Sequence, residues 1–218
     1  MKRTLPLDRP GELRRLIVQR LEHTLPHTDF ESAARANALS AVNALVREYL
    51  PANPIAAAVL VPIIDRSEGL TVLLTQRASH LRHHAGQISF PGGRIEVDDE
   101  GPLQAALREA QEEIGMTREL VRPVGYLAPQ LVVSGYWVTP VVSLVEPKFA
   151  LQLDPREVDA TFEVPLSHVL DPANHHPRER RIGDQIVQVH EIPFGPYRIW
   201  GATAAMLMEL YRVLTMDG

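Results

Sequence analysis

The sequence of 218 residues contains no cysteine. This absence excludes disulfide bonds, zinc sites built on thiolates and cysteine nucleophiles, so any metal would have to bind oxygen or imidazole ligands. The chain also lacks an excess of basic residues, because its formal net charge is −5. We therefore expect no nucleic-acid partner, since phosphate backbones are bound by strongly basic surfaces.

Long hydrophobic runs are absent as well. The longest, residues 55–64, is too short to span a bilayer and is interrupted by Pro62, which is typical of a buried strand. Residues 1–6 carry charge but are not followed by the apolar run that an export signal needs. We therefore predict a cytoplasmic protein that does not bind membranes.

The residues that are present indicate two kinds of organisation. Residues 11–50 show helical spacing in two segments that Pro26 separates, which predicts an N-terminal helical extension over residues 1–50. From residue 55 onward the pattern favours one α/β domain over residues 51–218, a sheet covered by helices. The predicted strands are 55–64, 71–75, 121–127, 136–145 and 186–192, and the predicted helices are 102–114 and 202–214.

The helix predicted over 102–114 has an acidic edge. Glu109, Glu112 and Glu113 project into an arc of roughly 100° beside an apolar stripe. Glu109 and Glu113 are one turn apart, and two carboxylates about 5 Å apart repel by roughly 3 kcal/mol at an effective dielectric of about 20. A divalent cation such as Mg²⁺ or Mn²⁺ would remove this penalty. The alternative is that the three glutamates form a solvated helix face.

The pattern around these glutamates resembles a known family. Residues 93–116 are similar to the Nudix box, the metal-binding loop-helix-loop of hydrolases that act on nucleoside diphosphates linked to other groups. One gap differs, because the usual pattern has seven residues between a loop acid and the arginine, whereas eight follow Asp99 before Arg108. Counting back from Arg108 selects Glu100 instead. The loop acid is therefore either Asp99 or Glu100.

A second block resembles the coenzyme A pyrophosphatases within that family. It comprises residues 73–77, Arg82, Gly86 and residues 90–93, and residues 162–166 and 197–203 resemble the C-terminal half. The likeness spans about residues 55–214 and implies a Nudix α/β/α sandwich with a mixed sheet. It also implies a Mg²⁺ or Mn²⁺ requirement and cleavage of coenzyme A into 4′-phosphopantetheine and adenosine 3′,5′-bisphosphate.

The resemblance assigns roles to the helix residues. Glu109, Glu112 and Glu113 would hold the metal, and Arg108 would orient them through charge-assisted hydrogen bonds. Arg108 would otherwise be one half of a surface pair with Glu112, four residues away. Nudix enzymes often take a further carboxylate from a distant loop. Glu157 is the first candidate here and Glu163 the second, although either is more often a surface acid.

Residues upstream of the helix are expected to contact substrate. Gly92 and Gly93 let the loop approach a ligand, or else form a plain tight turn. Arg77 and Arg82 are candidates for binding phosphates, since the guanidinium fork matches phosphate oxygens. His83 and His84 are expected to be solvated loop residues.

Two further segments have open interpretations. The basic run at residues 178–181 is expected to face solvent between polar turns. Tyr136 and Trp137 either stack on adenine or belong to the core of a strand, which is the commoner role.

Three alternative functions compete with coenzyme A hydrolysis. The nearest is the same chemistry on another small-molecule substrate, such as ADP-ribose or NADH. The second is a non-catalytic Nudix module that senses a nucleotide, against which the intact glutamate trio argues. The third, an RNA-processing enzyme, conflicts with the acidic balance of the chain. The helical extension fits either a homodimer interface or a cap on its own sheet.

Overall fold

The computed structural model describes residues 4–29, 32, 51, 53–132 and 134–216. The second predicted helical segment, near residues 34–46, lies outside these residues. The helices are α1 (Pro10–Leu21), α4 (Pro102–Ile114), α5 (Leu166–Leu170) and α6 (Gly201–Thr215), with short 3-10 turns at Arg118–Leu120 and Pro172–Asn174. No described helix has the length and apolar character needed to cross a bilayer.

The strands form two sheets. The larger sheet contains β1 (Ile55–Arg66), β2 (Gly69–Arg77), β3 (Ile88–Ser89), β4 (Gly92–Arg94), β5 (Val121–Tyr126), β6 (Gln130–Val132), β7 (Tyr136–Val145) and β8 (Val158–Pro165). The smaller sheet contains β9 (His176–Ile182), β10 (Gln185–Phe194) and β11 (Tyr197–Trp200). In the larger sheet, strands β3, β2, β1, β7 and β5 lie side by side, and among the described strands only the β1–β7 pair is parallel.

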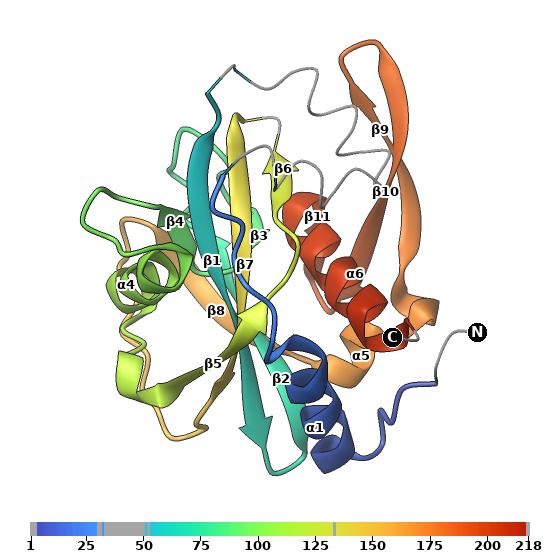
Figure 1. Cartoon of the computed structure of the whole chain (residues 1–218). Coiled ribbons are helices and arrows are strands. Elements are labelled where there is room, and N and C mark those ends of the chain that lie inside the picture. Colours follow the sequence, from blue (N-terminus) through green and yellow to red (C-terminus); the bar gives the residue numbers. More distant parts are fainter. Residues whose placement is uncertain (1–3, 30–31, 33–50, 52, 133, 217–218) are drawn as a thin grey trace.

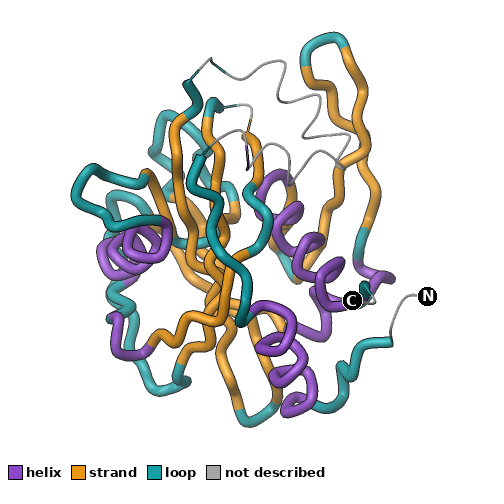
Figure 2. The backbone as a smooth tube through the Cα atoms, in the orientation of Figure 1, coloured by secondary structure: helices purple, strands orange, loops and turns teal. Residues whose placement is uncertain are grey.

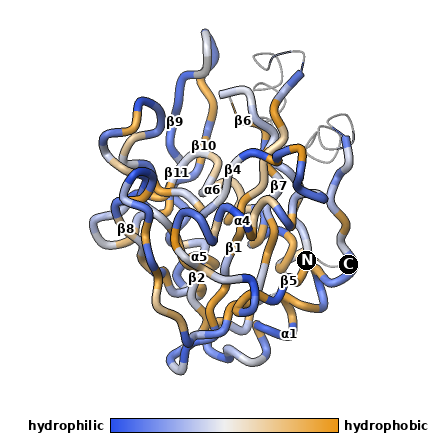
Figure 3. The backbone as a smooth tube through the Cα atoms, turned by 90° about the vertical axis from the view of Figure 1, so that its left-hand side faces the viewer, coloured by the Kyte–Doolittle hydropathy of each residue, from blue (hydrophilic) through white to orange (hydrophobic). Residues whose placement is uncertain are grey.

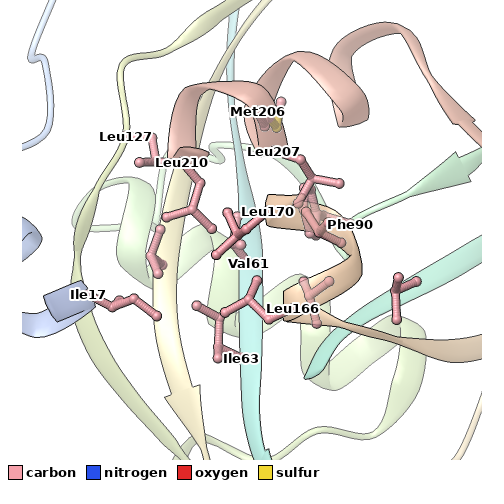
Figure 4. Close-up of a cluster of buried hydrophobic side chains, with 14 of the residues drawn as sticks. Ile17, Val61, Ile63, Phe90, Leu127, Leu166, Leu170, Met206, Leu207 and Leu210 are labelled. Atoms are coloured by element: carbon pink, nitrogen blue, oxygen red, sulfur yellow. The ribbon is translucent and has the colours of Figure 1, made fainter. Parts of the chain in front are cut away.

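Helices cover both faces of the larger sheet (Figures 1 and 2). Because side chains alternate along β1, Leu60 and Ile64 belong to the buried cluster that includes apolar residues of α4, whereas Val61 and Ile63 belong to the cluster that includes those of α1, α5 and α6. Figure 4 shows the second of these clusters, in which residues of α6 lie over the centre of β1. The prediction of a mixed sheet between helical layers is confirmed.

The first predicted helical segment forms α1, which is fastened to the sheet. Its apolar side is buried, and a Cβ at Gly125 of β5 would collide with the carbonyl oxygen of Leu21. The hydroxyl of Thr24 donates to the same carbonyl (2.7 Å) and accepts from the backbone N–H of Tyr126 (2.7 Å). Of the two uses considered for the extension, α1 therefore caps its own sheet, while the boundary at residue 50 and a homodimer remain predictions.

The predicted elements agree with the structure within a few residues, but several strands were not anticipated. The unpredicted elements are β3, β4, β6, β8, β9, β11 and α5. Residues 178–181 lie in β9, paired with β10, between the 3-10 turn Pro172–Asn174 and the turn at residues 183–184, so the run sits between turns as expected. Their side chains are exposed as expected, and Figure 3 shows β9 as hydrophilic.

Candidate active site

The helix α4 begins and ends where the sequence predicts. Pro102 occupies its first turn, and Gly115 ends it in the left-handed conformation (φ 70°), which a residue with a side chain rarely adopts. Its buried residues lie against β1, as the apolar stripe predicts. The packing of this stripe fixes the rotation of the helix, and the glutamate edge follows from it.

Glu113 is the most deeply buried acid of this edge, with 3% of its surface exposed. Its carboxylate accepts a hydrogen bond from the backbone N–H of Gly92 (3.1 Å) and lies 3.8 Å from the guanidinium of Arg77. Burial raises the pKa of Glu113 to about 8, and the charges of the nearby Glu157 and Glu109 also raise it. The hydrogen bond from Gly92 and the charge of Arg77 lower this pKa and so oppose the rise. A carboxyl group held this far from water favours a cation or a proton beside it.

Glu109 lies one turn before Glu113 and is partly buried. Burial raises its pKa, the hydrogen bond from Arg108 (2.9 Å) opposes this, and the charges of Glu112 and Glu157 add to the rise. Glu112 is different, since 60% of its side chain is exposed and its carboxylate lies 3.3 Å from Arg108. The solvated-face alternative therefore describes Glu112 but not Glu109 or Glu113.

Arg108 makes many more contacts than a surface pair would need. It donates two hydrogen bonds to Asp99 (3.2 and 2.9 Å) and one to the carbonyl oxygen of Arg94 (3.0 Å), besides its contacts with Glu109 and Glu112. The bonds from Arg108 lower the pKa of Asp99, whose side chain is 3% exposed. Such a fork fixes the rotamers of the acids around it.

Asp99 is therefore the loop acid that contacts Arg108. Its carboxylate also accepts from the backbone N–H of Glu96 (2.9 Å), which closes a tight turn. The backbone N–H of Glu100, the other candidate, donates to Gln104 (2.9 Å). The extra residue in this loop leaves the Asp99–Arg108 contact in place.

The two glycines before the helix serve different purposes. Gly92 has a φ of 154°, and a Cβ there would collide with the backbone of β1. At Gly93 the constraint is space, because a Cβ would collide with the carboxylate of Glu109. Both are more than a plain turn, since they let strand β4 lie against Glu109 and Glu113.

The predicted arginines differ in their position. Arg77 lies beside Glu113, and its Nε atom is buried without a hydrogen-bond partner in the described structure. Arg82 is exposed in the loop between β2 and β3, as are His83 and His84. Arg77 is thus placed at the carboxylates, and a role for Arg82 in binding substrate remains a prediction.

Glu157 is near the helix edge although it is far away in the sequence. Its charge raises the pKa of both Glu109 and Glu113, while its own side chain is exposed. The loop that carries it is bonded to the end of α4, because the backbone N–H of Asp154 donates to the carbonyl oxygen of Glu113 (2.9 Å). The backbone N–H of Glu157 donates in turn to the carbonyl oxygen of Asp154 (3.0 Å).

Comparison with known proteins identifies the family of this arrangement. The family model of the NUDIX domain matches residues 54–186. An uncharacterized Nudix hydrolase, NudL, of Shigella flexneri is 43% identical over 162 residues, which cover 73% of this chain and 83% of the relative. The chain belongs to the Nudix hydrolase family.

Two further proteins are similar to this chain. The NudL protein of Salmonella paratyphi B is also 43% identical, over 71% of this chain and 80% of the relative. A solved structure of a C. elegans Ap4A hydrolase has 22% identity and a TM-score of 0.45, over 50% of this chain and 80% of that one.

Nudix hydrolases generally use divalent metal ions, and the acids of this chain are not fully gathered around one point. Among the residues that the structure describes, no three histidines or acids are placed as ligands of a single ion. The carboxylate of Glu112 lies 3.3 Å from Arg108, and its side chain is exposed. The roles of Glu109, Glu112 and Glu113 as metal ligands therefore stay predictions.

Several residues of this Nudix hydrolase have roles that the sequence did not settle. Glu163 is paired with Arg66 and Thr71, and although burial alone would raise its pKa, the hydrogen bonds from these residues lower it. These bonds account for Glu163 without a catalytic role. Trp137 is buried, which agrees with a core position.

Arg94 also contacts residues of the site, although the sequence did not predict it. Its guanidinium donates twice to the hydroxyl of Tyr136 (3.0 and 2.8 Å), and its carbonyl accepts from Arg108. Its position directly after Gly92-Gly93 was the available signal.

Proposed function

We propose that this Nudix hydrolase cleaves the diphosphate of coenzyme A or one of its derivatives, giving 4′-phosphopantetheine and adenosine 3′,5′-bisphosphate. The observation that carries the proposal is the contact between Arg77 and Glu113 (3.8 Å). Arg77 ends the block of residues 73–77 that resembles the coenzyme A pyrophosphatases, and Glu113 belongs to the Nudix box. The block that resembles the coenzyme A pyrophosphatases and the Nudix box are therefore in contact through this pair of side chains.

Two carboxylates of this site are of the donor type that a hard divalent ion prefers. Glu109 and Glu113 supply carboxylate oxygens on one helix edge, and their raised pKa values reflect negative charge that burial disfavours. Glu109, Glu113 and, after a rotamer change, Glu112 would hold Mg²⁺ or Mn²⁺. When bound, the ion would polarise the phosphoryl oxygens and lower the pKa of a bound water.

Residues of the chain would bind the diphosphate, position the carboxylates and accept a proton. Arg77 has an unpartnered Nε atom and would donate to a phosphoryl oxygen of the diphosphate. Arg108 holds the carboxylate of Glu109 in place through its bonds to Asp99 and Arg94. Glu157, exposed beside both buried glutamates, would accept the proton of the attacking water as its oxygen bonds to phosphorus and the bridging P–O bond breaks.

A substrate panel tests the proposal. The pure protein is incubated with Mg²⁺ and, separately, with coenzyme A, its disulfide, an acyl ester, ADP-ribose and NADH, and the products are resolved by chromatography. We expect kcat/KM for a coenzyme A species to exceed the values for ADP-ribose and NADH by more than tenfold, which is about 1.4 kcal/mol in the transition state. A smaller preference, or a preference for ADP-ribose or NADH, contradicts the substrate assignment. Ligand binding without any product, even with Mn²⁺, would instead indicate a nucleotide sensor.

A further inference from the structure

The outer side of α1 borders a hollow whose lining contains none of the candidate catalytic residues. The inner side of this helix is buried in the core through Leu13, Leu16, Ile17 and Leu21. Its outer side, together with Arg122 of β5, lines a surface hollow of about 430 Å³. This volume is within the range of roughly 300–1,000 Å³ that small-molecule sites occupy.

The hollow is on the side of the sheet opposite α4. The buried residues of α1 belong to the core cluster shared with α5 and α6, and those of α4 belong to the other cluster. Figure 1 shows α1 and α4 on different sides of the central strands. Gly11 forms part of the lining, and a Cβ at this position would meet no atom within 4 Å, so the hollow is open there.

Positive charge dominates the lining. Arg14, Arg15 and Arg122 all border the hollow, and Glu22 is the acid among the lining residues. Arg14 lies 3.3 Å from Asp65, outside the lining, and the carboxylate of Glu22 lies 3.7 Å from His23. Within the described part of the chain, Arg15 and Arg122 make no hydrogen bond or ion pair through their side chains.

Like charges that line one hollow repel each other, and a multivalent anion between them replaces this repulsion with attraction. Guanidinium groups match the geometry of phosphoryl oxygens in particular, because each can donate two parallel hydrogen bonds. The hollow has a larger volume than a single ion needs, and Val18 adds an apolar surface to the lining. These features favour a small molecule with a phosphoryl group over a simple inorganic ion of low charge.

We propose that the hollow bordered by Arg14, Arg15 and Arg122 is a second binding site, which takes a small molecule with two or more negative phosphoryl charges. The site is separate from the catalytic carboxylates and requires no metal. The group that the site would recognise is a diphosphate, either as free pyrophosphate or as part of a nucleotide.

The test is calorimetric titration of the full chain in EDTA, with inorganic pyrophosphate and ADP as probes and adenosine as the uncharged control. We expect one molecule of pyrophosphate or ADP to bind, and adenosine not to bind. Equal affinity for both probes would place recognition in the phosphoryl groups alone, whereas tighter binding of ADP would add the nucleoside. No binding of either probe at millimolar concentration overturns the proposal.

Matched variants locate the binding. The double variant Arg15→Gln/Arg122→Gln is expected to bind the probes at least tenfold more weakly, because both unpaired guanidiniums are lost. Arg118→Gln, an exposed arginine outside the hollow, is expected to bind within twofold of the wild type. Glu113→Gln is also expected to keep binding, which separates the site from the catalytic one. Unchanged affinity in the double variant contradicts the proposal even if hydrolysis of coenzyme A is confirmed.

Discussion

The helices α4 and α1 pack on opposite faces of one sheet and gather opposite charges. Both have proline in the first turn and lack a side-chain N-cap, and both bury an apolar face against the sheet. On α4, Glu109 is partly buried and Glu113 is almost wholly buried, whereas the arginines beside α1 are exposed. Buried carboxylates carry a standing electrostatic cost that a cation relieves, while exposed guanidiniums remain solvated with or without a ligand. We therefore expect α4 to depend on its ligand far more than α1 does.

The largest effect is expected from removing charge at the buried acid. Glu113→Gln keeps the shape of the side chain but loses the negative charge, and we expect kcat to fall by about 10²- to 10⁴-fold with Mg²⁺ present. Steady-state kinetics on the preferred substrate, with circular dichroism to verify folding, measures this. Glu119→Gln, an exposed acid outside α4, provides the control, and near-normal turnover in Glu113→Gln would rule out the assigned site.

The glycine on the α4 side provides a sharper contrast. In Gly93→Ala the new Cβ would collide with the carboxylate of Glu109, the far end of a flexible side chain. The carboxylate can move aside, so we expect kcat/KM to fall by about 100-fold, as small misplacements at reacting groups do, with little loss of stability. Kinetics and thermal melting of the same preparation separate the two effects. A large fall in Tm with turnover intact would contradict this account of Gly93.

The matched glycine on the α1 side should behave in the opposite way. In Gly125→Ala the Cβ would collide with the backbone carbonyl of Leu21, which cannot move without shifting α1. We expect a loss of about 1–3 kcal/mol in the free energy of unfolding, with kcat nearly unchanged. Urea denaturation measures the first quantity. If Gly125→Ala abolished turnover while remaining stable, the two faces would not be independent.

The smallest effect is expected from pH. The folded-state pKa of Glu113 is raised to about 8, above its value in the unfolded chain, so the folded state holds this proton more tightly. This contribution to stability is complete below the unfolded pKa of about 4.3 and is lost as pH rises through about 8. In EDTA, we expect the Tm of the wild type to fall by a few degrees relative to Glu113→Gln between pH 5 and pH 8. Parallel melting curves over this range would contradict the shift.

The sequence predicted the elements that have residues typical of a boundary at their ends or a long apolar run within them. Pro102 and Gly115 bound α4, and the apolar run after residue 54 marks β1. Strand β4 spans only Gly92–Arg94, which is too short to show a periodic pattern. It is held in place by pairing with β1. Strand β9 has charged residues on consecutive positions, so no alternation reveals it.

The candidate site was predictable to the same extent. Helical spacing alone places Glu109 and Glu113 on one edge. The depth of Glu113, the fork of Arg108 on Asp99 and the space that Gly93 leaves for Glu109 depend on how β4 lies against α4. These contacts join residues on separate elements, and a periodic pattern contains no information about them.

The bond from the Asp154 amide to the Glu113 carbonyl makes the last turn of α4 and the Glu157 loop a single mechanical unit. Moving the Glu157 loop away from Glu113 would break this bond and fray the end of α4. The position of Glu157 and the end of the helix would thus be lost in one event. Hydrogen exchange at the Asp154 amide would measure how often this opening occurs.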